Sequence, residues 1–198
     1  MFGGKKYDDV PAKTVLRSLR NGVSPSKHGS HSEKVLTLSA ITQGTFDPEA
    51  WKNGEFDECP PEDKRIKQNE LYICRGNGNK TLVGTAVYSK MPHSDLVFPD
   101  TVIAATVDES LIQMPYLCAA WRMSSVREQI EEQARTTNGT YKINQSIIEN
   151  IMITLPPLAM QEEFVTFLEQ SDKSKFAAQQ ALKEVTDAQK ALMKKIFE

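Results

Sequence analysis

The chain has 198 residues, of which 25% are charged, and its formal net charge at pH 7 is −2. This length allows one domain with an appendage, or two small domains. No apolar run approaches the ~20 residues that a membrane helix needs, and residues 1–11 lack the apolar segment of a signal peptide. We therefore expect a cytoplasmic protein without membrane contact. The slightly acidic balance argues against strong non-specific nucleic-acid binding, but it leaves room for a local basic face.

Residue types that carry metal or covalent chemistry are scattered along the chain. Cys59, Cys74 and Cys118 form no C-x-x-C pair, which predicts reduced thiols rather than disulfides or a zinc site. The stretch "GNGNKT" at residues 76–81 lacks the glycine spacing of a phosphate-binding loop, so we interpret it as a turn. We expect no metal, no cofactor and no catalytic site.

In chain order, residues 1–155 predict an α/β (α+β) domain with a mixed sheet. Alternating apolar residues indicate a half-buried strand at 34–41, followed by a turn. Residues 70–89 predict a hairpin around the Gly/Asn-rich stretch 76–80, and 100–107 predict a core strand. Helical spacing indicates a helix at 114–134, in one or two pieces. A polar loop at 135–144, a short helix at 144–150 and a strand at 151–155 complete the domain.

After Pro156 and Pro157 the pattern becomes helical and stays so to residue 198. Proline is tolerated in a first helical turn, and no glycine or proline follows Leu158. Apolar and small residues recur in 4-3 spacing, which predicts a coiled-coil seam. About 40 residues would span roughly 60 Å, so this long helix needs a partner helix; folding back onto its own domain is the alternative. The predicted interface residues are Phe164, Leu168, Ala178, Leu182, Val185, Leu192 and Ile196.

Four polar segments are candidates for nucleic-acid contact. Arg and Lys bind phosphates or guanine, and Asn and Gln pair with adenine. Each segment alone is also typical of a solvated loop. The candidate DNA-binding residues are Arg20, Asn21 and Lys27; Thr42 and Gln43; Arg75, Asn77, Asn79 and Lys80; and Arg135, Thr137, Asn138 and Lys142.

The stretch "ARTTNGTYKINQSIIENIMITLPPLAMQEEFVTFLEQSD" at residues 134–172 resembles the specificity (S) subunit of type I restriction-modification enzymes. In that family a Gly/Thr-rich loop, a short Asn/Ser-led helix and a strand precede a helix that begins Pro-Pro-Leu-x-x-Gln-x-x-Ile. Here Met160 stands where an acidic residue is usual, and Phe164 replaces the isoleucine. "NELYICRGNGNKTLVGTAVY" resembles the family's Gly-Asp-Leu-x-x-x-Arg-x-Gly segment, and "RNGVSPSK" resembles its early Gly-x-Ser/Thr-Pro turn.

The resemblance implies a non-catalytic subunit with a target recognition domain at 1–155 and a long helix at 156–198. Such a subunit binds double-stranded DNA at a bipartite site. It directs adenine methylation and restriction there, together with a methyltransferase (modification) subunit and a restriction (translocase/nuclease) subunit. A full S subunit has two recognition domains and two helices. This chain, with one of each, is expected to be a half-subunit or a truncated product, working as an antiparallel homodimer or with another half-subunit.

Two alternatives remain open. The chain could be a coiled-coil protein-interaction adaptor that contacts no DNA, or a recognition-domain fragment of a fused restriction-methyltransferase. Convergence of the four polar segments on one basic face favours DNA recognition, whereas scattered segments favour the adaptor.

Overall fold

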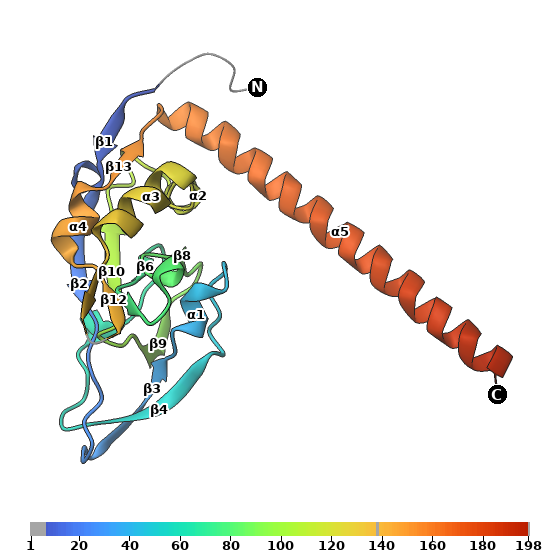
Figure 1. Ribbon diagram of the computed structural model, residues 1–198, viewed down its shortest axis with the longest axis horizontal. Coiled ribbons are helices and arrows are strands. Elements are labelled where there is room, and N and C mark those ends of the chain that lie inside the picture. The colour runs from blue at the N-terminus through green and yellow to red at the C-terminus, as the bar shows by residue number, and fades with distance from the viewer. Residues whose placement is uncertain (1–6, 138, 198) are drawn as a thin grey trace. The chain divides into compact units, whose positions relative to one another are not determined.

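The computed structural model describes residues 7–137 and 139–197 (Figure 1). Backbone contacts divide the chain into two compact units, Met1–Leu158 and Ala159–Glu198. The first unit holds every strand among the described residues, and the second is formed by one helix. Each unit is described separately below.

A four-stranded antiparallel sheet forms the centre of the first unit. Its strands, in spatial order, are β2 (Leu16–Asn21), β10 (Val102–Val107), β6 (Leu71–Cys74) and β8 (Ala86–Tyr88). Successive side chains of a strand point to opposite faces. Leu71 and Ile73 therefore enter one apolar core, whereas Tyr72 and Cys74 enter another. Burial of both faces explains why β6 and β10 read as continuous apolar runs.

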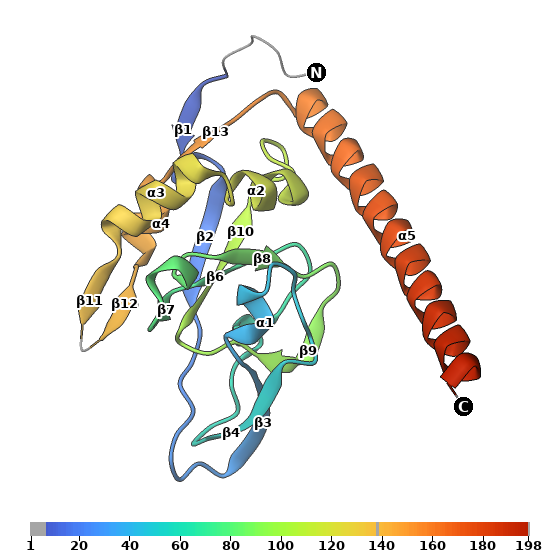
Figure 2. The ribbon, with the colours of Figure 1, turned by 45° about the vertical axis from the view of Figure 1, so that its right-hand side comes forward.

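The two cores are closed by different elements (Figure 2). Three helices pack on the face that holds Leu71: α2 (Met114–Ala120), α3 (Ser124–Gln133) and α4 (Gln145–Asn150). The opposite face packs against α1 (Ser39–Thr42) and a second four-stranded sheet. That second sheet has the order β4 (Trp51–Phe56), β3 (His31–Leu36), β9 (His93–Val97) and β5 (Arg65–Ile66), and only its β3–β9 pair is parallel.

Two small sheets complete this unit. β1 (Asp9–Pro11) pairs with β13 (Met152–Thr154) and so ties together the first and last strands. β11 (Arg135–Thr137), β12 (Thr140–Lys142) and β7 (Gly76–Asn77) form a three-stranded sheet, called here the hairpin sheet. Short 3₁₀ turns occupy Ala12–Thr14, Glu62–Lys64 and Lys80–Leu82.

The predicted α/β class is confirmed, but two predicted elements are wrong in detail. The strand predicted at 34–41 ends at Leu36, because its partner strand β4 begins opposite that residue at Trp51. Residues 39–42 form α1 instead. The loop predicted at 135–144 contains the β11–β12 hairpin. Gly139, between these strands, has a φ of +74°. An Asn-Gly dipeptide in a sequence is a strong hairpin signal that the prediction did not use.

One close approach fixes α3 on the central sheet. Gly84 has a φ of +72°, and a Cβ atom there would lie 2.5 Å from Cγ2 of Ile130. The carbonyl of Gly84 accepts a 2.9 Å hydrogen bond from Nε1 of the fully buried Trp121. Only glycine supplies both the positive φ and the missing side chain.

The second unit is the helix α5 (Leu158–Phe197), 40 residues long as predicted. Its apolar side chains at Leu182, Val185 and Leu192 are 60–68% exposed in this chain. Phe167 and Phe176 are also exposed, and Phe176 lies about a third of a turn away from the predicted seam. The side chain of Ile196 lies outside the described residues. None of the described helices combines the length and apolar character that crossing a membrane requires.

Candidate nucleic-acid interface

The hairpin sheet joins two of the four predicted polar segments. β7 comes from the Gly/Asn-rich stretch after β6, and it pairs with β12 in the register Tyr141↔Asn77 and Lys142↔Gly76. The backbone N–H of Ile143 donates a 2.9 Å hydrogen bond to the carbonyl of Arg75. Arg75 and Asn77 are therefore brought beside Lys142, which is more than 60 residues away along the chain.

Two basic side chains face each other across this sheet. Arg135 and Lys142 are directly opposite in the antiparallel β11–β12 pair, and both residues are exposed. Like charges directly opposite on neighbouring strands destabilise the pair. No ion pair is formed by either side chain among the described residues. An anion placed over the sheet would relieve this repulsion.

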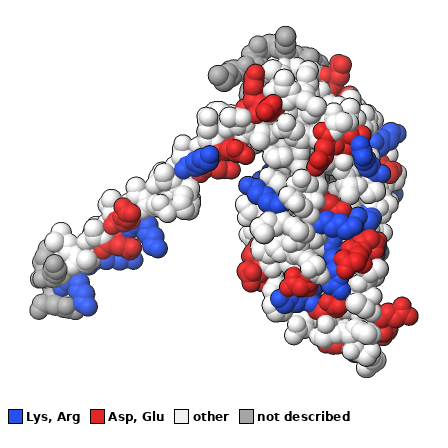
Figure 3. All heavy atoms as spheres, turned by 180° about the vertical axis from the view of Figure 1, so that it is seen from behind, with Lys and Arg blue, Asp and Glu red and all other residues white. Residues whose placement is uncertain are grey.

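The segments that form the hairpin sheet also lack acidic residues. No Asp or Glu occurs at 71–94, which holds Arg75, Lys80 and Lys90, or at 133–148, which holds Arg135 and Lys142. The chain as a whole has a net charge of −2. Basic and acidic side chains are interleaved over the face seen in Figure 3. The positive charge is therefore a local property of the joined segments, as the sequence allowed.

Asn21, from the first polar segment, lies at the edge of the same region. Gln145, at the start of α4 just after β12, donates a 3.3 Å hydrogen bond from Nε2 to Oδ1 of Asn21. Nζ of Lys64 donates to the main-chain carbonyl of Asn21 at 3.1 Å. Lys64 was not predicted, because the acidic stretch around it, "PPEDKR", gives no sign of a contact with β2. Asn21 and Gln145 thus add two amides beside the hairpin sheet, whereas the charge of Lys64 is paired with Asp63 at 3.1 Å.

Arg20 is held in a buried ion pair. Its Nη2 lies 2.6 Å from Oε2 of Glu70, and the two side chains are 17% and 3% exposed. The hydroxyl of Tyr72 donates to the same carboxylate oxygen at 3.0 Å. Burial, reinforced by the Glu70 charge, raises the pKa of Tyr72 above its ordinary value, so the hydroxyl stays a donor. Arg20 is therefore left out of the interface that we propose below.

Three other predicted residues are engaged locally. Nη1 of Arg75 donates to the carbonyl of Asp100 at 3.1 Å, which holds the half-buried guanidinium in place. Oδ1 of Asn77 accepts from the N–H of Asn79 at 2.9 Å. Oδ1 of Asn79 in turn accepts from the N–H of Thr81 at 3.0 Å and so caps the 3₁₀ turn that contains Lys80. These bonds order the tip that follows β6.

The remaining predicted residues differ in their placement. Lys27 is exposed in the loop between β2 and β3. Thr42 and Gln43 are not joined to the hairpin sheet by any hydrogen bond among the described residues. Thr42 donates to the carbonyl of Leu38, and the carbonyl of the neighbouring Gly44 accepts from Arg122 at the end of α2. Asn138 and the side chain of Thr137 lie outside the described residues.

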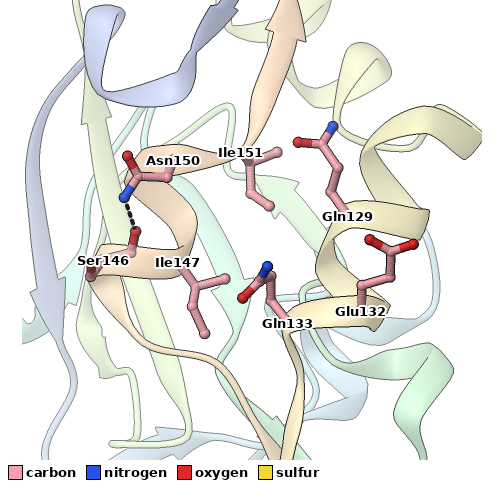
Figure 4. Close-up of a pocket in the computed structure, with 7 residues that line it drawn as sticks. All are labelled: Gln129, Glu132, Gln133, Ser146, Ile147, Asn150 and Ile151. Carbon is pink, nitrogen blue, oxygen red and sulfur yellow. Dashed lines mark hydrogen bonds between the residues drawn. The ribbon is translucent and has the colours of Figure 1, made fainter.

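A groove of about 250 Å³ lies between α3 and α4 (Figure 4). The side-chain amide of Gln129, on the wall of the groove, is already hydrogen-bonded to Met152. It accepts from the N–H of Met152 at 2.7 Å and donates to the carbonyl of the same residue at 3.0 Å. The lining contains one carboxylate and no His, Cys, Lys or Arg, so it offers no acid–base pair. Its residues are Gln129, Glu132, Gln133, Ser146, Ile147, Asn150 and Ile151. Within the described ranges, no group of three or more His, Cys, Asp or Glu could hold a metal ion.

These features define a class of protein. A β-rich domain carries a local basic surface with several amides, and a separate long helix exposes apolar side chains. Cations that hold phosphates, amides that read base edges and a helix for association are typical of a DNA-binding module that acts in a larger assembly.

Comparison with known proteins identifies the family. Residues 64–186 match the family model of the type I restriction modification DNA specificity domain. The chain belongs to this family, and the resemblance noted in the sequence is confirmed. It is 26% identical over 192 residues to the EcoKI specificity subunit of Escherichia coli (strain K12), an alignment that covers 93% of this chain and 41% of that protein.

Two solved structures have a similar fold. The HsdS subunit from Thermoanaerobacter tengcongensis gives a TM-score of 0.58 at 15% identity, covering 91% of this chain and 41% of that one. The type I restriction-modification S subunit from M. genitalium gives a TM-score of 0.53 at 13% identity, covering 86% and 40%. This chain therefore spans about two fifths of the length of its relatives.

Proposed function

We propose that this chain is the DNA-recognition part of a type I restriction-modification system and reads one half of a bipartite site. The hairpin sheet would lie against the DNA, with Arg135 and Lys142 on phosphates. The amides of Asn21 and Gln145, at the edge of the sheet, would face base edges, where Asn and Gln pair with adenine. Asn77 pairs with Tyr141, so its side chain leaves the other face of the sheet from Lys142. The chain itself supplies no catalysis in this proposal.

The observation that carries the proposal is the pairing of β7 with β12. It joins two acid-free basic segments. The neighbouring β11–β12 pairing places Arg135 opposite Lys142 without a counter-charge. Such an arrangement costs stability, and a bound polyanion would offset that cost. Three of the four predicted polar segments contribute to this region, which favours DNA recognition over a protein-interaction adaptor. The segment with Thr42 and Gln43 is not part of it.

We propose that the long helix α5 mediates association with a second copy of the chain. Two such helices packed antiparallel about a two-fold axis would place two recognition domains on an interrupted palindrome, one on each half-site. The exposed side chains of Leu182, Val185 and Leu192 would fill that interface. We propose that Phe176, on another side of the helix, contacts the methyltransferase subunit, which would methylate adenine at the bound site. The restriction subunit would join the same assembly. A second, different half-subunit could replace the second copy.

A double variant tests the interface directly. Arg135→Ala with Lys142→Ala should lower affinity for duplex DNA by about tenfold or more at moderate salt. It should also reduce the slope of log affinity against log salt by roughly 2, since two phosphate contacts are lost. Folding stability should stay the same or rise slightly, because a repulsive cross-strand pair is removed.

Lys52→Ala is the matched control, since Lys52 is exposed on β4 of the second sheet. Binding is best followed by fluorescence anisotropy of the full chain at several salt concentrations. Mapping of methylated adenines with the methyltransferase subunit present then reports the recognised site. Equal affinity and an equal salt slope in the double variant and the control would contradict the proposal.

A further inference from the structure

Four Asn-Gly dipeptides occur in the chain, at residues 21–22, 53–54, 77–78 and 138–139. In such a pair the backbone nitrogen of glycine can attack the side-chain carbonyl carbon of asparagine, because no side chain shields that nitrogen. The reaction needs the glycine nitrogen to be free and the backbone able to bring it to the asparagine Cγ. The structure describes both residues of three of these dipeptides. The three sites differ in how strongly the backbone is restrained.

In two of the three dipeptides the backbone is restrained by its neighbours. Gly22 donates its N–H to the carbonyl of Val102 at 3.1 Å, and a Cβ on Gly22 would lie 2.1 Å from the carbonyl oxygen of Pro99. Asn53 and Gly54 lie inside β4 and pair with β3. In both places the backbone is fixed by the sheet or by its neighbours. Ring closure there first requires local opening of the structure.

The backbone at Asn77–Gly78 is less restrained, although the Asn77 side chain forms a hydrogen bond with Cys74. β7 ends at Asn77, and Gly78 is exposed. The N–H of Gly78 has no hydrogen-bond acceptor among the described residues. The N–H of Asn79 donates to Oδ1 of Asn77 at 2.9 Å. This hydrogen bond closes a turn around Gly78, and it polarises the side-chain carbonyl carbon that would be attacked.

We propose that Asn77 is a site of spontaneous deamidation in the folded protein. The nitrogen of Gly78 bonds to Cγ of Asn77, the bond from Cγ to the side-chain nitrogen breaks, and that nitrogen leaves as ammonia. Water then opens the resulting succinimide at either carbonyl and gives aspartate or isoaspartate. One water is consumed and one ammonia is released, with no oxidant or reductant.

The position gives this modification a consequence, which rests on the proposed DNA contact. Asn77 pairs with Tyr141 in the hairpin sheet and lies next to the Gly76–Lys142 pair. Deamidation places a carboxylate in a segment that otherwise holds no acidic residue. The side chains of Asn77 and Lys142 leave opposite faces of the sheet, because Lys142 pairs with Gly76 and Asn77 pairs with Tyr141. The new carboxylate therefore repels a bound phosphate from a longer distance than a direct contact and weakens binding by about twofold to threefold. Recognition would therefore decline as the protein ages.

The chemical step is tested by mass spectrometry on the full folded chain, incubated in mildly alkaline buffer. Trypsin separates the three dipeptides, because cleavage after Arg20, Lys52 and Arg75 gives peptides 21–27, 53–64 and 76–80. The peptide 76–80 should gain the deamidation mass at Asn77 at least about tenfold faster than the other two gain it. A digest of unincubated protein sets the background.

Gly78→Ala is the matched control variant. A Cβ at Gly78 meets no atom within 4 Å, and Gly78 has no positive φ. The fold should therefore be kept, while the added methyl group shields the attacking nitrogen and slows the reaction severalfold. Equal rates in the three peptides, or an unchanged rate in Gly78→Ala, would overturn the assignment of the site.

A separate measurement tests the consequence. Asn77→Asp should bind duplex DNA about twofold to threefold more weakly than Asn77→Gln, which has an amide but forms the ring poorly. Equal binding by these two variants would overturn the link to recognition, even if peptide 76–80 deamidates as expected. Failure of the Arg135/Lys142 variant to change DNA binding would instead contradict the proposed interface itself.

Discussion

The ion pair between Arg20 and Glu70 gives the sharpest stability prediction. Glu70→Gln should lower the free energy of unfolding of the recognition domain by about 2–4 kcal/mol. The carboxylate accepts from Arg20 at 2.6 Å and from the Tyr72 hydroxyl at 3.0 Å, and Glu70 is only 2% exposed. Two charges about 4 Å apart attract by about 4 kcal/mol at the effective dielectric of a protein. Removing one partner leaves the other charge buried and uncompensated, which costs about 3–5 kcal/mol.

The glutamine amide can still accept hydrogen bonds, so the expected loss for Glu70→Gln lies near the lower end of the cost of an unpaired buried charge. Nε of Arg20 is already buried without a partner, so the guanidinium has little to replace the carboxylate. In contrast, Arg20→Met combined with Glu70→Leu removes both charges and should lie within about 1 kcal/mol of the original protein. The comparison separates the cost of an unpaired charge from the net value of the pair.

Urea denaturation followed by tryptophan fluorescence measures both variants, because Trp121 is fully buried and reports the packed core. A change below about 0.5 kcal/mol in Glu70→Gln, or a double variant as unstable as the single one, would refute this reasoning. The double variant also tests the interface. It should bind DNA as the original protein does, and a loss of affinity in a folded sample would place Arg20 among the DNA contacts.

Three further predictions concern the helix, the acid range and the thiols. Leu182→Asp should abolish a homodimer or the methyltransferase complex in analytical ultracentrifugation, whereas Gln180→Asp on the opposite side of the helix should not. Hydrogen bonds from Arg65 hold the pKa of Glu33 below its usual range. The stability that this carboxylate contributes is therefore present at neutral pH and lost as pH falls through its lowered pKa, and Glu33→Gln should flatten the acid side of a stability profile. Burial raises the pKa of Cys74 to about 11 and also raises the pKa of Cys118. In the native state a thiol reagent should therefore modify only the exposed Cys59. Rapid labelling of all three thiols would contradict the buried placement of Cys74 and Cys118.

Local sequence patterns predicted many of the elements that surround the interface. The hairpin of β6 and β8, the strand β10, the two-piece helix α2–α3 and the short helix α4 all follow from local residue patterns. The strands β2, β4 and β9 were not predicted. β4 contains the sequence "WKNGEF", in which Asn and Gly are typical of turns, and it becomes a strand through its pairing with β3.

The sequence by itself determined the class of this protein. The long glycine-free helix follows from local rules, and the Pro-Pro-Leu-x-x-Gln junction resembles that of the specificity-subunit family, to which the chain belongs. Only the tertiary structure decided which polar residues lie together. The pairing of β7 with β12 joins residues more than 60 positions apart and brings Arg75 beside Lys142. Arg20 instead forms an ion pair with Glu70, which lies 50 positions away along the chain. The order of charges along a chain does not predict these long-range contacts, because sheet register and core packing set them rather than neighbouring residues.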